Sequence, residues 1–211
     1  MKLRSRGGRA LLAALTVCGL NAPARATGDD DDESEPRPAQ RSLAIPVGHT
    51  LVLMTGMRAA EAIIWPEPFA EVSPNTMWLH YREAFTRAPK WQADQPWYSK
   101  DGDPWAVNLV GHALFGSEVM LRARACGQSP LEAFLLTAAA STAWEYVWEA
   151  NGARPSGWDL MYTPLAGLVL GELRFQGFRA ARGVSSPALR AVLKTTLDPL
   201  GELERALGTR C

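Results

Sequence analysis

Two glutamates stand one helical turn apart inside a segment that is otherwise almost entirely apolar. Glu145 and Glu149 fall in the run Ser141-Thr-Ala-Trp-Glu-Tyr-Val-Trp-Glu. An ionised carboxylate is costly to bury unless a partner, a bound proton or a polar cavity compensates for the lost water. The two carboxylates therefore predict the part of the chain in which a functional site lies.

A histidine occupies one face of an earlier helical segment. Asn108, His112 and Gly116 recur at every fourth position and share that face, among apolar neighbours. If this face meets the one that carries Glu145 and Glu149, an imidazole and two carboxylates converge. Such a set binds divalent zinc, manganese or iron, performs general acid–base chemistry, or forms a paired structural network. Helical di-metal sites usually carry a Glu-x-x-His pair, which this chain lacks, so the pattern favours the structural network over a divalent metal.

A third carboxylate follows the glutamates at the start of the next expected helix. The run Ser156-Gly-Trp-Asp159 has the spacing of a capping box, with Ser156 as N-cap and Asp159 reaching back to it. Small residues then recur at every fourth position and permit a close approach of helices. The candidate catalytic residues are His112, Glu145, Glu149 and Asp159, with Asn108, Ser156, Thr163, Gly167 and Gly171 in supporting roles.

Helix start and stop signals predict an all-α fold, a single bundle of about five to six helices. Ser129-Pro130-Leu131-Glu132 combines an N-cap serine, a proline at the first helical position and a capping-box glutamate. No alternating strand pattern competes with the helical periodicity. The expected helices cover residues 45–64, 74–88, 105–125, 129–150 and 156–179, and a last amphipathic segment begins at Ser186-Pro187 and is interrupted at Asp198-Pro199.

The first 26 residues have the order of a secretory signal peptide. Basic residues precede an apolar stretch from Ala10 to Leu20, and Ala24-Arg-Ala26 places small residues where signal peptidase cleaves. Cys18 raises lipidation as an alternative, although valine precedes it. We expect residues 27–42 to form a disordered acidic leader, and residues 43–211 to form the helical domain, located in the periplasm or at the outer envelope of a bacterium.

Charge and cysteine content narrow the range of partners. The chain has 22 basic and 22 acidic residues; removing residues 1–26 takes away five basic and no acidic residues and leaves 17 against 22, a net charge of −5. This acidic balance argues against nucleic acid as a partner. Cys126 and Cys211 would remain after cleavage, and the sequence leaves open whether they pair.

The apolar segments raise the question of a membrane. The uncharged runs at residues 133–144 and 160–171 are 12 residues each, whereas a spanning helix needs about 20. All eight tryptophans fall between Trp65 and Trp158, and Trp is enriched where proteins meet the membrane–water interface. The pattern indicates core helices or half-length segments, with an envelope lipid or membrane surface as a candidate partner. The oligomeric state is left open.

Several of these motifs together resemble a bacterial family. The motifs are Asp101-Gly-Asp103, Asn108-Leu-Val-Gly-His112, Glu145 to Glu149 and Pro155 to Glu172. Together they resemble the bacterial domain of unknown function 3943, and the resemblance covers about residues 75–180. Ala113 departs from it, because proline is expected at that position. A more distant likeness extends to VanZ-like envelope proteins. The resemblance implies a helical envelope domain built around Asn108, His112, Glu145, Glu149 and Asp159. The family has no established activity to carry over to this chain.

Two functions fit these observations. The chain is either a membrane-associated binding or scaffold domain with a buried polar cluster, or an envelope lipid- or glycan-acting hydrolase or transferase that uses His112 and a carboxylate, with or without a metal. A nucleophile motif such as Gly-x-Ser-x-Gly is absent from the sequence, which favours the binding or scaffold function.

Overall fold

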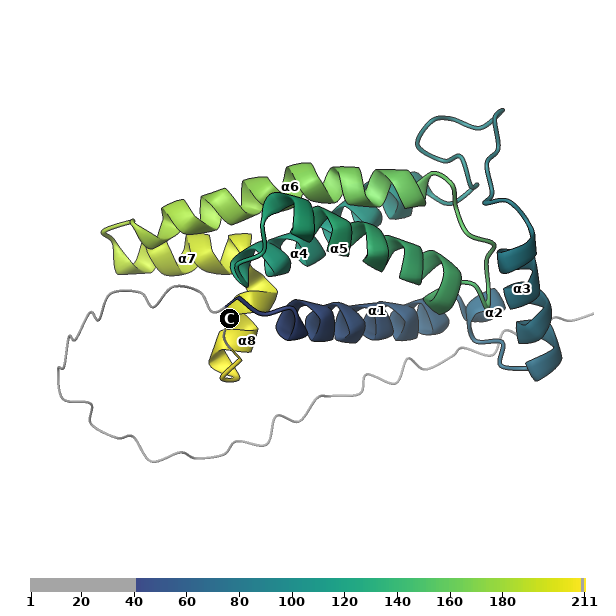
Figure 1. Ribbon diagram of the computed structural model, residues 1–211, viewed down its shortest axis with the longest axis horizontal. Helices are drawn as coiled ribbons and strands as arrows, with labels where there is room; N and C mark the ends of the chain where they lie inside the picture. The colour runs from purple at the N-terminus through teal and green to yellow at the C-terminus, as the bar shows by residue number, and fades with distance from the viewer. Residues whose placement is uncertain (1–40, 210) are drawn as a thin grey trace, which may run out of the picture. The chain divides into compact units, whose positions relative to one another are not determined.

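The described residues of the computed structural model, 41–209 and 211, fold into helices and contain no β-strand, which confirms the predicted all-α class. Figure 1 shows the helices in chain order. Their bounds are α1 (Ala44–Ile64), α2 (Pro66–Phe69), α3 (Pro74–Thr86), the π-helical η1 (Ala106–Gly111), α4 (His112–Ala125), α5 (Pro130–Ala143), the π-helical η2 (Trp144–Trp148), α6 (Asp159–Arg182), α7 (Pro187–Leu197) and α8 (Pro199–Ala206).

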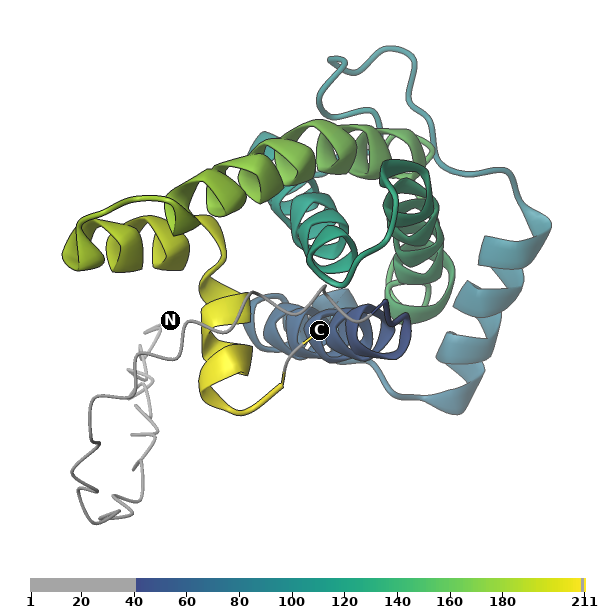
Figure 2. The ribbon, with the colours of Figure 1, turned by 60° about the vertical axis from the view of Figure 1, so that its left-hand side comes forward.

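Helix α4 is the centre of the bundle. Every residue from 115 to 123 is buried, because α1, α5 and α6 pack around it (Figure 2). The apolar core joins Met54 of α1, Phe115 and Val119 of α4, Ala140 of α5 and Trp144 of η2. Each of the larger side chains contributes about 1.5–3 kcal/mol through burial.

Glycines bring α4 and α6 into backbone contact. A methyl group on Gly167 would lie 2.7 Å from the backbone carbonyl of Gly116, and one on Gly171 would collide with Met120. The expected series of small residues on α6 therefore serves the α4–α6 contact. Gly116 is one turn from His112 and Gly167 is one turn from Thr163, so this contact also sets the spacing of the polar residues.

The helix boundaries largely follow the sequence signals. Ser129 and Glu132 form the predicted capping box, with Glu132 N–H donating to the serine hydroxyl and Ser129 N–H donating to the glutamate. The prediction was wrong by a few residues elsewhere. The fourth helix ends as η2 at Trp148 rather than at residue 150, and α6 begins at Asp159 and ends at Arg182 rather than covering 156–179. The short α2 was not predicted.

Buried ion pairs attach the C-terminal helix to the centre of the bundle. Arg122 of α4 lies 3.1 Å from Asp198 and 3.2 Å from Glu204. His49 of α1 joins the same network, 2.5 Å from Glu204 and 3.5 Å from Glu118. Asp198 also caps α8 by accepting from the N–H of Gly201. These contacts therefore hold α8 against α1 and α4.

A disulfide joins Cys126 to Cys211. It resolves the pairing that the sequence left open, and it closes a loop with a sequence separation of 85 residues. The bond links the end of α4 to the last residue of the chain.

The expected signal peptide at 1–26, the lipidation of Cys18 and residues 27–40 of the acidic leader lie outside the described residues. Within residues 41–209, the helices include none whose length and apolar content would let it cross a membrane.

Candidate functional site

Three of the predicted side chains converge at the α4–α6 contact. His112 opens α4, Glu145 lies in η2 and Asp159 opens α6, and one potential ligand atom from each lies within 4.8 Å of the other two. His112 Nε2 is 3.6 Å from Asp159 Oδ2, and His112 Nδ1 is 2.9 Å from the hydroxyl of Thr163. Glu145 and Asp159 are each only 2% exposed and His112 is 8% exposed. The three side chains, called the His–Glu–Asp cluster below, are thus enclosed in protein.

The two π-helical segments, η1 and η2, lie next to the cluster. In η1 the N–H of His112 donates to the carbonyl of Val107, and in η2 the N–H of Glu149 donates to the carbonyl of Trp144. A π turn takes in one residue more than an α turn, and such turns occur frequently at functional sites. The wider turns place Asn108 and Glu145 on the inner side of the bundle.

A buried network of hydrogen bonds fixes the groups around the cluster. The backbone N–H of Ser156 donates to Glu145 Oε2 at 2.6 Å, and the hydroxyl of Ser156 donates to Asp101 Oδ2 at 2.7 Å. The amide of Asn108 donates to the other oxygen of Asp101 at 2.7 Å. Asp101 therefore connects the chain before η1 to the chain before α6.

The capping box predicted at Ser156 is only half present. The N–H of Asp159 does donate to the Ser156 hydroxyl, at 3.1 Å. The side chain of Asp159 does not reach back, because Glu145 accepts the Ser156 N–H. Asp159 is thereby left to contact His112.

The two aspartates of the network have opposite pKa shifts. Burial alone would raise the pKa of Asp101, but four hydrogen bonds outweigh burial and lower its pKa to about 2; the donors are the side chains of Asp159, Ser156 and Asn108 and the backbone of Asp103. Burial, followed by the hydrogen bond with Asp101 and its charge, raises the pKa of Asp159 to about 9. At neutral pH the pair therefore shares one proton, held by Asp159.

The other two members of the cluster also favour their neutral forms. Burial lowers the pKa of His112 to about 4. Burial, together with the charges of Glu149 and Asp159, raises the pKa of Glu145 well above its ordinary value. The cluster consequently holds an uncharged imidazole beside two carboxyl groups, those of Glu145 and Asp159, whose protonated forms are favoured.

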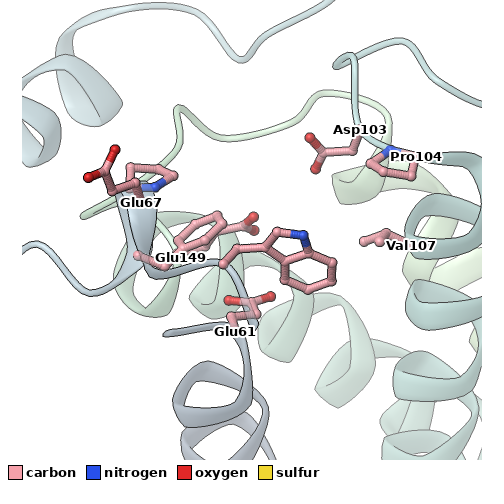
Figure 3. Close-up of a pocket in the computed structure, with 9 residues that line it drawn as sticks. Glu61, Glu67, Asp103, Pro104, Val107 and Glu149 are labelled. Carbon is pink, nitrogen blue, oxygen red and sulfur yellow. The ribbon is translucent and has the colours of Figure 1, made fainter. Parts of the chain in front are cut away.

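Glu149 does not join this cluster, contrary to the prediction that it shares a site with Glu145. It lines an open cavity of about 210 Å³ together with Glu61 at the end of α1 and Asp103, and the cavity has Trp65 and Phe69 in its wall. Figure 3 shows the three carboxylates reaching the cavity from different segments of the chain. Burial and then the charges of Glu61 and Asp103 raise the pKa of Glu149 to about 8.

Aromatic side chains pack beside the start of α6. The ring of Trp158 stacks on Tyr162 at 5.3 Å between centroids and contacts Trp97 at 5.8 Å and Trp91 at 6.4 Å. The hydroxyl of Tyr162 donates to the carbonyl of Leu109. These contacts fix the first turn of α6, which carries Asp159, against the segment that carries His112.

The structure thus brings together most of the residues that the sequence singled out. Asn108, Ser156 and Thr163 hydrogen-bond to the network, and Gly167 and Gly171 form the close helix contact. Sequence reasoning did not include Asp101 among the candidate site residues. A signal was available, because the Asp101-Gly-Asp103 motif belongs to the series that carries the family resemblance.

The family comparison supports that resemblance. The model of the family described as domain of unknown function DUF3943 matches residues 97–200. Residues 97–200 of the chain belong to the DUF3943 family. The DUF3943 match includes Asp101 and the whole His–Glu–Asp cluster, whereas Glu61 of the open cavity lies before it. No curated protein and no solved structure matches the chain. The more distant likeness to VanZ-like envelope proteins stays a prediction.

Proposed function

We propose that this DUF3943 chain is an exported bacterial envelope protein whose helical domain binds at a membrane surface and acts as a binding or scaffold component. The observation that carries the proposal is the outward face of α6. Met161, Leu165, Val169 and Leu173 recur along it and are 49–65% exposed, and residues 160–171 contain no charged side chain.

The neighbouring helix also exposes apolar side chains. Helix α5 packs against α6, its Leu131 and Leu135 are more than half exposed, and residues 133–144 are also uncharged. Exposed apolar side chains, where they form a contiguous patch, mark a protein–protein or membrane interaction site. Apolar helix faces bury themselves in the boundary between lipid headgroups and acyl chains.

Two observations support export. The first 26 residues have the order of a signal peptide, and the described residues contain the disulfide between Cys126 and Cys211. Disulfides persist in oxidising compartments such as the bacterial periplasm and are rare in the cytosol. A periplasmic or outer-envelope location agrees with both.

Flotation with lipid vesicles tests the membrane proposal. Purified mature protein is mixed with vesicles of phosphatidylethanolamine and phosphatidylglycerol and centrifuged through a density gradient. We expect the wild type to float with the vesicles. The double substitution Leu165→Gln and Val169→Gln, which makes the α6 face polar, should leave the protein at the bottom of the gradient.

The matched control changes two apolar residues elsewhere that are even more exposed than Leu165 and Val169. Val72 and Leu207 are 77% and 76% exposed, and Val72→Gln with Leu207→Gln should float like the wild type. A wild type that stays at the bottom overturns the proposal. A second outcome also overturns it: the wild type does not bind lipid but forms a dimer, and the α6 double substitution dissociates that dimer. A second copy of the chain would then cover the α6 face.

A second candidate is hydrolysis or group transfer on an envelope lipid or glycan. The contact between His112 Nε2 and Asp159 Oδ2, with an open cavity nearby at Glu149, favours it. The test is mass spectrometry of an envelope lipid and glycan extract incubated with the protein. A product that forms with the wild type and not with Glu145→Gln supports enzymatic activity, and an unchanged extract contradicts it.

A further inference from the structure

The His–Glu–Asp cluster leaves buried oxygen atoms without hydrogen-bond partners. Glu145 Oε1 and Asp159 Oδ1 have none among the described residues, and neither has Asn108 Oδ1 beside them. The three side chains are at least 98% buried. Buried polar atoms in native proteins are nearly always paired with protein, water or an ion, so each unpaired one requires an explanation.

The remaining atoms of the same side chains are held in the manner of metal ligands. Thr163 contacts His112 Nδ1, which leaves Nε2 facing Asp159. Ser156 N–H donates to Glu145 Oε2 and leaves Oε1 unpaired. Metal-binding side chains are oriented in this way, with one atom fixed by a second hydrogen bond while the other faces the ion.

No protein cation compensates for these carboxylates. Within residues 41–209, no Arg or Lys nitrogen lies within 4.0 Å of the carboxylates of Asp101, Glu145 or Asp159. The adjoining cavity adds Glu61, Asp103 and Glu149, with Arg58 at 3.8 Å from Glu61 as the nearest basic partner. A cleft lined by one sign of charge concentrates ions of the opposite sign. Glu149 of this cavity is one helical turn from Glu145, so further carboxyl groups lie near the cluster.

We propose that His112, Glu145 and Asp159 bind one divalent first-row transition-metal ion, of which Zn²⁺ and Mn²⁺ are the two to be tested. One imidazole nitrogen and two carboxylate oxygens within 4.8 Å of one another provide the mixed donor set that these ions accept. This site goes beyond the membrane-binding role, which depends on the outward faces of α5 and α6. The ion would lie between the starts of α4 and α6 and hold η2 against both helices.

Isothermal titration calorimetry on metal-stripped protein tests the proposal. The mature protein is treated with a chelator, desalted and titrated with ZnCl₂ and separately with MnCl₂. We expect about one ion per chain for at least one of the two metals, with a rise in melting temperature on loading. Glu145→Gln replaces a ligand with an amide of the same shape and should weaken binding by at least about tenfold.

Two further variants complete the design. Glu83→Gln makes the same substitution on α3, away from the cluster, and should bind metal like the wild type. Thr163→Val keeps all three ligands but removes the partner of His112, so it should weaken binding about tenfold or more even if Glu145→Gln does not fold. A wild type that binds neither metal overturns the proposal. Wild-type affinity in a folded Glu145→Gln or Thr163→Val variant overturns it as well.

Discussion

Adding a single methyl group at Gly167 should separate the two helices that carry the cluster. The Cβ atom of Gly167→Ala would lie 2.7 Å from the backbone of Gly116, and ordinary contacts begin at 3.4 Å. The helices must therefore move apart by about 0.7 Å, because backbone atoms on both sides have no alternative rotamer. Overpacking of this kind costs about 1–3 kcal/mol.

The assay is thermal unfolding followed by circular dichroism. For a domain of this size 1 kcal/mol corresponds to about 2–4 °C, so Gly167→Ala should melt roughly 2–12 °C below the wild type. Gly56→Ala is the matched control, since it lies within α1 and its Cβ would have no neighbour within 4 Å. Alanine is the better helix former by roughly 0.5–1 kcal/mol, so the control should melt slightly higher than the wild type. A Gly167→Ala variant at or above the wild-type melting temperature would refute the close α4–α6 contact.

The pH dependence of stability and the disulfide give two further predictions. Burial raises the pKa of Glu61 from 4.5 to about 7, so between these two pH values the folded state retains a proton that the unfolded chain loses. The contribution of Glu61 to the free energy of unfolding is therefore full below about pH 4.5. It falls by about 3 kcal/mol as the pH rises through 7. Urea unfolding of metal-free protein between pH 5 and 8 should show this fall in the free energy of unfolding, and the fall should be shallower for Glu61→Gln. Equal pH dependence in the two proteins would contradict the raised pKa of Glu61. The Cys126–Cys211 bond should contribute about 2–4 kcal/mol, so Cys211→Ser and reductant-treated wild type should unfold at the same lower urea concentration. A wild type unaffected by reductant would count against that bond.

Local signals predicted the helices well because they act within a few residues. Ser129 with Glu132, and the prolines at the first positions of α3, α5, α7 and α8, satisfy or remove N–H groups that every helix start leaves unpaired. The π turns were not predictable, since a wider turn depends on what packs around it. The short α2 also begins with a proline, Pro66, but it has only four residues and was not predicted.

The site was predicted only in part, because spacing along one helix does not reveal what lies opposite. Glu145 and Glu149 are one turn apart, yet Glu145 faces the start of α6 and Glu149 faces the end of α1. Asp101 is far from Ser156 in the sequence and meets it only through the tertiary fold. The sequence indicated which residues carry chemistry, and packing decided which of them meet.

Anomalous diffraction tests the central claim most directly. Crystals of the mature protein grown with Mn²⁺ or Zn²⁺ are measured at the absorption edge of the metal. The account predicts one anomalous peak among His112 Nε2 and the carboxylate oxygens of Glu145 and Asp159, at about 2.0–2.2 Å from each. A cluster that carries no peak for either metal, while its side chains keep the positions described above, would contradict it.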